Sequence, residues 1–126
     1  GFGVLFADRL KPLRIRGWRL RERIFRRDAE GHVVVCGAGH KGYQLASNLL
    51  ADGRDVVVVE HDAESTRAKE LGDRGALVLQ EDATRERTLG RRAKAHLAAE
   101  VFVNCGSDDT NTQVARTLTN WLDRRR

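Results

Sequence analysis

The sequence predicts an α/β fold in which an open parallel sheet, with strand order 3-2-1-4, has helices on both faces. Apolar, β-branched runs recur along the chain, segments with apolar residues at helical spacing separate them, and the connections are short. Such continuous apolar runs indicate strands that are buried on both faces. Right-handed crossovers then bring the carboxyl ends of all strands to one edge of the sheet, where ligands of such folds bind.

The first strand–turn–helix unit is the most informative stretch. A strand is expected at His32–Cys36 and a helix from about Lys41 to Ala51, with the G-x-G-x-x-G sequence Gly37–Gly42 between them. In a Rossmann-like dinucleotide-binding unit the first glycine allows the turn, the second lets the backbone approach a pyrophosphate, and the third allows close helix–strand packing. The N-terminus of the helix would then face the phosphates.

An acidic residue follows the second strand. Val56–Val59 is a continuous apolar run, and Glu60 comes directly after it, 18 residues beyond Gly42. Rossmann units place a carboxylate here to accept hydrogen bonds from the adenosine ribose. Because a carboxylate repels a 2′-phosphate, the residue favours NAD(H) over NADP(H). We interpret His61 as a solvated neighbour of the ligand, without a residue nearby to orient it as a base.

The remaining elements continue the alternation of strands and helices. Asp62 or Ser65 would cap a helix that runs to about Leu71. The later elements are a strand at Ala76–Leu79, a helix from Thr84 to about Arg92, a strand at Ala99–Val103, and a helix from about Asp109 to Leu122.

Four loops should meet at the carboxyl edge of this sheet. They contain Gly37–Gly42, Glu60, Asp82–Thr84 and Asn104–Ser107. A six-stranded sheet would need two strands more than this sequence supplies. We therefore expect either that the chain is a fragment, truncated after the fourth strand and its helix, or that another chain or the N-terminal segment covers the edge of the fourth strand.

The net charge of +5 lies in the N-terminal segment. Residues 1–31 contain nine Lys/Arg and four Asp/Glu, whereas residues 32–126, the expected domain, are balanced. Leu13–Arg21 alternates like a strand, but Arg19–Arg27 could equally form a basic helix. The segment is either a connector docked on the domain, a membrane-proximal segment attracted to anionic lipid, or, more weakly, a nucleic-acid contact, for which no recognition motif is present.

Other classes of site have little support in the sequence. Cys36 and Cys105 each end an apolar run, as buried cysteines in a reduced protein do. No Cys/His cluster suggests a metal site, and no apolar run approaches the length of a membrane span or a signal peptide. We expect a cytoplasmic location, at or near the inner face of a membrane.

From His32 to about Asn120 the sequence resembles the TrkA-N domain, the N-terminal nucleotide-binding lobe of the RCK (regulator of potassium conductance) family. The resemblance rests on the apolar run and glycine motif at Val33–Gly42, on Glu60 after Val56–Val59, and on two further motifs. Asp82-Ala83-Thr84 matches the Gly-Asp-Ala-Thr common in the family, with Glu81 in place of the glycine. Ser107-Asp108-Asp109-Thr110-Asn111 is similar to its Ser-Asp-Asp/Glu-x-Asn.

The resemblance implies a regulatory domain that binds NAD(H), or ATP or ADP in some members, and acts on a potassium channel or transporter. It further implies a membrane subunit as partner, with no nucleic acid. The exposed sheet edges and apolar helix faces that so short a chain leaves favour a homodimer or larger ring. Gly37–Gly42 would hold the phosphates, Glu60 the ribose, Asp82 and Ala83 the adenine side, and Cys105 and Gly106 the other half of the ligand. The candidate binding residues are therefore Gly37, Ala38, Gly39, His40, Lys41, Gly42, Glu60, His61, Asp82, Ala83, Thr84, Cys105 and Gly106.

One alternative function is a membrane-surface or nucleic-acid binding module formed by the basic segment on a Rossmann scaffold. Another is a fragment of an NAD-dependent oxidoreductase, which would need a side chain that exchanges a proton with the substrate. The side chains that could do so are those of His40, Lys41, Tyr43, His61, His96 and Cys105. His96 precedes the fourth strand, at the wrong edge of the sheet. Lys41 and Tyr43 do not form the Tyr-x-x-x-Lys pattern of short-chain dehydrogenases. The sequence therefore favours a non-catalytic domain.

Overall fold

The computed structural model describes residues 24–25 and 29–125. Most of the basic N-terminal segment, including the expected strand at Leu13–Arg21, lies outside these residues, as does most of the alternative helix at Arg19–Arg27. Ile24 and Phe25, which belong to that alternative, are helical.

The sheet has the predicted architecture. Its strands are β1 (Val33–Cys36), β2 (Val56–Val59), β3 (Leu77–Leu79) and β4 (Glu100–Val103). They are parallel and ordered β3-β2-β1-β4, which confirms the 3-2-1-4 prediction. Strands β1, β3 and β4 each begin one residue later than predicted.

In the described part of the chain three α-helices flank the sheet, and all have the predicted positions with shifted ends. They are α3 (His40–Ala51), α4 (Thr66–Asp73) and α5 (Asp108–Arg124). Of the two caps considered for α4, the structure uses Ser65, whose Oγ accepts a hydrogen bond from the Ala68 N–H at 3.1 Å. Asp62 instead accepts from the N–H of Glu64, within the loop.

The helix predicted from Thr84 to Arg92 is wrong in its start and in its winding. Thr84 belongs to the preceding turn, helical structure begins at Glu86, and Thr88–Arg92 (η1) is a π-helix. A short 3-10 turn, Ala95–Leu97 (η2), follows, and Lys94 between them has a positive φ of 51°. The spacing of apolar residues does not distinguish an α-helix from a single π-helical turn, because over so few residues both place the apolar side chains on one face.

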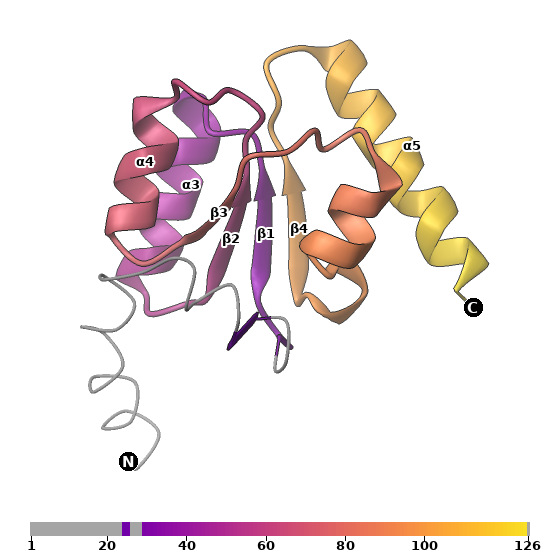
Figure 1. Cartoon of the computed structure of the whole chain (residues 1–126), viewed down its shortest axis with the longest axis horizontal. Helices are drawn as coiled ribbons and strands as arrows, with labels where there is room; N and C mark the ends of the chain where they lie inside the picture. Colours follow the sequence, from indigo (N-terminus) through magenta and orange to yellow (C-terminus); the bar gives the residue numbers. More distant parts are fainter. Residues whose placement is uncertain (1–23, 26–28, 126) are drawn as a thin grey trace.

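Alternate side chains of the strands bury two separate apolar layers. Val33, Val35 and Val58 face α3 and α4, and Val34 and Val57 face η1 and α5. Figure 1 shows these helices on opposite sides of the sheet. Each fully buried valine contributes about 1.5–3 kcal/mol to folding. The two-sided burial that the β-branched runs predict is therefore present.

Strand β4 is less covered than the other strands. Glu100 is exposed, and Val101, Phe102 and Val103 are half-buried. In the described part of the chain no strand lies beyond β4. The expectation that another segment or chain covers this edge stays a prediction.

Phe25 joins the end of the N-terminal segment to the amino edge of the sheet, where the strands begin. Its ring packs against the core layer that contains Val34 and lies edge-on to the ring of His32, with 4.8 Å between ring centres. The Lys94 Nζ is 5.8 Å from the centre of the Phe25 ring. At this point the segment is docked on the domain. Within the described ranges, no helix has the length and apolarity to cross a membrane, and no three side chains are grouped as metal ligands.

His32 is a buried titratable group, only 3 % exposed. Its Nε2 is 2.8 Å from the carbonyl oxygen of Ala93, to which it donates, and its Nδ1 is buried without a hydrogen-bond partner. Burial lowers the pKa of His32, against weaker raising effects that include the Asp55 carboxylate, while the Lys94 ammonium adds to the lowering. Protonation would place a positive charge on this buried ring, with no acceptor for the added Nδ1 proton among the described residues.

The folded protein should therefore lose stability as the pH falls through about 6.5, because the unfolded chain binds the His32 proton more tightly. We expect His32→Gln to reduce the difference in unfolding free energy between about pH 7.5 and about pH 5.5. Urea unfolding at the two pH values measures this difference. His40→Gln, which alters an exposed histidine, serves as the comparison, and an undiminished difference in His32→Gln would contradict the prediction.

Candidate functional site

A cleft of about 860 Å³ opens at the carboxyl edge of the sheet. The arrowheads of β1 and β4 point to this edge in Figure 1, and residues of the loops that leave both strands line the cleft. Loops from all four strands line it. Its lining residues are Gly37, Gly39, Val59, Glu60, His61, Asp62, Ala63, Glu81, Asp82, Ala83, Thr84, Asn104, Cys105, Gly106, Ser107, Thr110 and Gln113.

The three glycines of the loop after β1 meet three different constraints. Gly37 has a φ of +99°, and a Cβ there would lie 2.2 Å from the carbonyl oxygen of Asn104. A Cβ on Gly42 would lie 1.9 Å from the carbonyl oxygen of Gly37, so α3 packs directly on the turn. At Gly39 a Cβ would meet no atom within 4 Å. Gly39, which lines the cleft, is thus the position where a ligand can approach the loop backbone without meeting a side chain.

The N-terminus of α3 differs from those of the other two helices. Ser65 and Ser107 cap α4 and α5 with their hydroxyls, whereas Gly39 at the start of α3 offers no side-chain cap, and the first turn of α3 contains no acidic residue. The first N–H groups of a helix have no carbonyl partner within it and carry partial positive charge. An anionic group in the cleft can therefore accept hydrogen bonds from them.

Glu60 connects the loops after β1 and β2. Its Oε1 accepts a hydrogen bond from the Ala38 N–H at 2.9 Å, and its Oε2 accepts from the Asp62 N–H at 3.0 Å. The side chain is 13 % exposed, and the Nδ1 of the exposed His61 lies 3.5 Å from Oε2. A carboxylate oxygen can accept more than one hydrogen bond. Glu60 is therefore held in place and still able to accept from a ligand.

The loop after β3 is fixed by Asp82. Its Oδ1 accepts hydrogen bonds from the Thr84 hydroxyl at 2.7 Å and from the Thr84 N–H at 2.9 Å. Both hydrogen bonds lower the pKa of Asp82, and the one from the Thr84 hydroxyl has the larger effect. Next to it, the Glu81 carboxylate accepts a hydrogen bond from Arg92 of η1. Glu81, which replaces the glycine expected there, thus ties the loop to the helix behind it.

The loop after β4 is shaped by the Ser-Asp-Asp-Thr-Asn sequence. The Asn111 Oδ1 accepts a hydrogen bond from the Cys105 N–H at 2.6 Å, and the Ser107 Oγ accepts one from the Thr110 N–H at 3.2 Å. The first bond folds the loop back over the start of α5, and the second caps the helix. Burial, and then the Glu60 and Asp82 carboxylates, raise the pKa of the Cys105 thiol. The thiol therefore stays protonated at neutral pH.

Carboxylates dominate the charge of the cleft. Four line it, on Glu60, Asp62, Glu81 and Asp82, and no Lys or Arg does so among the described residues. Arg92 lies behind Glu81 and is bonded to it. A ligand with phosphate groups would therefore depend on backbone N–H groups, and each additional negative charge on it would be repelled.

The structure brings together nine of the thirteen candidate residues. Gly37, Gly39, Glu60, His61, Asp82, Ala83, Thr84, Cys105 and Gly106 line the cleft. Ala38, His40, Lys41 and Gly42 do not line it, although the Ala38 N–H bonds Glu60 and the exposed side chains of His40 and Lys41 belong to the first turn of α3.

Sequence reasoning missed several residues of the walls. Val59, Asp62, Ala63, Glu81, Thr110 and Gln113 also line the cleft, together with Asn104 and Ser107, which were predicted to lie in the loop after the fourth strand but were not among the candidate binding residues. Most of them lie next to a candidate residue in the sequence and could have been found by extending each loop by a residue or two. Gln113 lies within α5, where only the direction in which the helix leaves the loop brings it to the cleft.

The family model described as the TrkA-N domain matches residues 33–125. No curated protein matches the chain.

The contact between Gly42 and Gly37 provides a test of the loop. We expect Gly42→Ala to destabilise the protein by about 1–3 kcal/mol, because its methyl group would overlap the Gly37 carbonyl. Gly72→Ala in α4 is the matched control. Its Cβ would lie 3.4 Å from a Val78 methyl, so it should be neutral or stabilising by up to about 1 kcal/mol. Urea unfolding measures both, and equal effects would contradict the packing described.

Proposed function

The chain belongs to the TrkA-N domain family, whose fold is a Rossmann-like nucleotide-binding fold, and we propose that it is a regulatory domain that binds NAD(H) and controls potassium transport. Its partner would be the membrane subunit of a channel or transporter, or a membrane domain of the same polypeptide. The domain would then lie in the cytoplasm, at the inner face of the membrane.

The observation that supports nucleotide binding best is the position of Glu60 beside the glycine loop. Its carboxylate is bonded to the Ala38 N–H, in the same loop that presents the open backbone at Gly39. An adenosine ribose on Glu60 would therefore have its attached phosphates over Gly39 and the uncapped N-terminus of α3. The adenine would extend towards Asp82 and Ala83, and the second nucleoside towards Cys105 and Gly106.

The charge of the cleft favours NAD(H) over ATP or ADP. The pyrophosphate of NAD+ carries fewer negative charges than the phosphates of ATP or ADP. Four carboxylates line the cleft and no Lys or Arg of the described residues does, although Arg92 pairs with Glu81 and Arg85 with Asp82 from outside the lining. Because like charges repel over these distances, the ligand with the smaller negative charge should bind better. The same argument disfavours the additional phosphate of NADP(H).

A regulatory role accords with the positions of the side chains that could transfer a proton. The Tyr43 hydroxyl donates to Glu70, between α3 and α4. His96 lies in η2, at the amino edge of the sheet and away from the cleft. His40 and Lys41 do not line the cleft, whereas His61 does, with its side chain 81 % exposed and its Nδ1 3.5 Å from the Glu60 carboxylate. The raised pKa of Cys105 makes its thiol a poor nucleophile. We therefore propose that the domain binds its nucleotide without converting it.

In the proposed mechanism the nucleotide connects loops that belong to different halves of the sheet. The loops after β2 and β3 lie on one side of β1, and the loop after β4 lies on the other. A ligand that contacts all of them favours the arrangement in which they are closest. In a homodimer or ring this preference would change how neighbouring domains pair, and thereby the state of the pore.

The ribose assignment predicts the effect of one substitution. We expect Glu60→Gln to weaken NAD+ binding by about tenfold or more, because a hydrogen bond to a charged acceptor contributes about 1.5–3 kcal/mol. Glu64→Gln, an equal change of charge in the same loop but outside the cleft, should leave the affinity within about twofold. Titration calorimetry with NAD+, NADH, ATP, ADP and NADP+ measures both variants.

Two results of this titration would contradict the proposal. One is an unchanged NAD+ affinity in Glu60→Gln, which would remove the ribose assignment. The other is tighter binding of ATP than of NAD+ and NADH to the unaltered protein, which would assign the cleft to an adenine nucleotide.

The role in transport is tested in the source cells. We expect Glu60→Gln, introduced into the chromosomal gene, to alter the rate of potassium uptake, because the variant domain can no longer report the nucleotide. Rubidium uptake measures this rate, with Glu64→Gln as the control. Unaltered uptake in Glu60→Gln, in a protein that has lost NAD(H) binding, would show that the nucleotide serves another purpose.

A further inference from the structure

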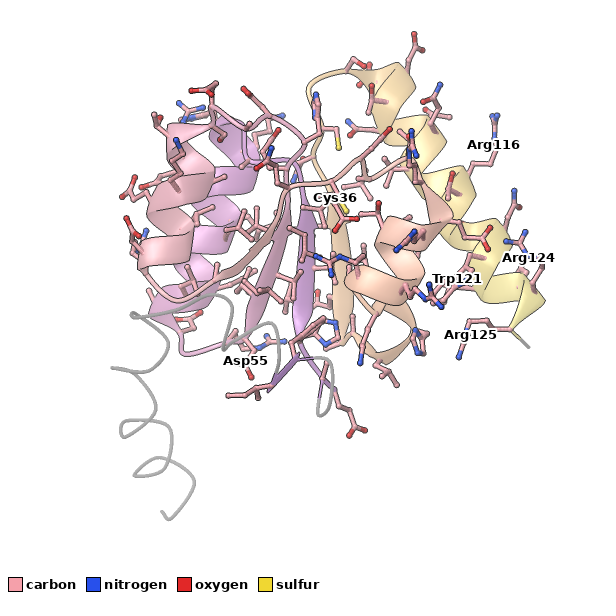
Figure 2. The ribbon with its side chains drawn as sticks, viewed as in Figure 1. Cys36, Asp55, Arg116, Trp121, Arg124 and Arg125 are labelled. Atoms are coloured by element: carbon pink, nitrogen blue, oxygen red, sulfur yellow. The ribbon has the colours of Figure 1, made fainter. Side chains whose placement is uncertain are left out.

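A second concave surface lies away from the nucleotide cleft, between η1 and the end of α5. It has a volume of about 600 Å³ and shares no lining residue with the cleft. Figure 2 shows Trp121 on the side of α5 that faces η1, with Arg125 below it. The lining residues are Glu86, Arg87, Gly90, Arg91, Lys94, His96, Trp121 and Arg125. We call this surface the basic pocket.

Cations outnumber anions in the basic pocket. Arg87, Arg91, Lys94 and Arg125 line it, with Glu86 as the one acidic residue in the lining. The Glu86 carboxylate forms an ion pair with Arg124, which is outside the lining, so it is not available to neutralise Arg87, Arg91 and Arg125. The basic pocket is thus the electrostatic opposite of the nucleotide cleft.

Aromatic packing gives the basic pocket a fixed wall. The edge of the His96 ring meets the Trp121 ring, with 5.1 Å between centres, and the Arg125 guanidinium lies 5.0 Å from the centre of the Trp121 ring. Gly90 lies against the same indole, where an added Cβ would be only 2.6 Å from a ring carbon. These contacts hold Arg125 and Trp121 in place, so the surface is more than a set of independent surface charges.

The π-helical turn η1, against which Trp121 packs, forms a further wall of the basic pocket. Gly90 and Arg91 belong to η1 itself, and Arg87 immediately precedes it. Single π-helical turns are rare and occur frequently at functional sites. The unusual backbone, the concave shape and the excess of cations thus coincide at one place.

We propose that the basic pocket is a second ligand site, which binds a multiply charged phosphate group. Guanidinium groups present paired N–H donors that match phosphate oxygens, and the lining contains three of them, on Arg87, Arg91 and Arg125. A single carboxylate would leave most of the positive charge unmatched. A soluble polyphosphate and the phosphate of a lipid headgroup both supply this chemistry.

The first experiment uses inorganic tripolyphosphate as the probe, in magnesium-free buffer of low ionic strength. Trp18 and Trp121 are the two tryptophans of the chain, so in a Trp18→Phe background the fluorescence reports on Trp121 alone. We expect a saturable change in that fluorescence. Arg87→Gln combined with Arg91→Gln should weaken binding by about tenfold or more, because two charge-assisted contacts are lost.

Arg116→Gln is the matched control. Arg116 is also an exposed arginine of α5, but it points away from the basic pocket (Figure 2) and does not line it. The variant should keep the affinity of the parent protein within about twofold. An equal loss of affinity in Arg116→Gln and in the double variant would show general attraction to a basic surface and overturn the proposal.

A second measurement reports on the inside of the basic pocket. Burial, and then the nearby Arg125 and Lys94, lower the pKa of His96. A bound phosphate would offset these cations, so tripolyphosphate should raise the pKa of His96, as followed by NMR titration. An unchanged pKa at saturating tripolyphosphate would mean that the anion is bound elsewhere, and would overturn the proposal.

Vesicles distinguish the two sources of the phosphate. The same variants are sedimented with vesicles of phosphatidylcholine alone and with vesicles that also contain phosphatidylserine. Binding only to the anionic vesicles, lost in the double variant and kept in Arg116→Gln, assigns the site to a lipid headgroup. Binding of tripolyphosphate without binding to vesicles assigns it to a soluble phosphate compound. Binding to neither probe overturns the proposal.

Discussion

The structure depends on a close contact between two backbone segments, where Gly42 of α3 lies against the carbonyl of Gly37. There is no room for a methyl group between them. The contact sets the direction in which α3 leaves the sheet. It therefore also determines where the uncapped N-terminus of α3 points. Gly37 in turn packs against the Asn104 carbonyl, so the position of the β4 loop depends on the same absence of side chains.

Much of this architecture could be predicted from the sequence, because its determinants are local. Val33–Val35 and Val56–Val59 are continuous β-branched runs, and such runs are stable when both faces of a parallel sheet are covered. The winding of η1 could not be predicted. There Gly90 lies against the indole of Trp121, a residue far along the chain, and apolar spacing does not reveal that contact.

The same limit applies to the candidate site. The position of Glu60 follows from the length of the unit that precedes it, but its bonds to Ala38 and Asp62 depend on how two loops meet. The pairing of Glu81 with Arg92, eleven residues apart, likewise requires the fold of the intervening turn. Sequence patterns thus identified the loops, while the interactions between loops needed the structure.

The hydrogen bond from Ala38 to Glu60 also bears on how fast a ligand can associate. A glycine-rich loop without such a bond would sample many conformations, and each encounter would have to wait for a competent one. Here the loop is joined to β2 before any ligand arrives. The conformational entropy of the loop is therefore lost on folding and not on binding, so association should approach the rate at which molecules meet in solution. Differences in affinity between nucleotides would then arise mainly from how long each one stays.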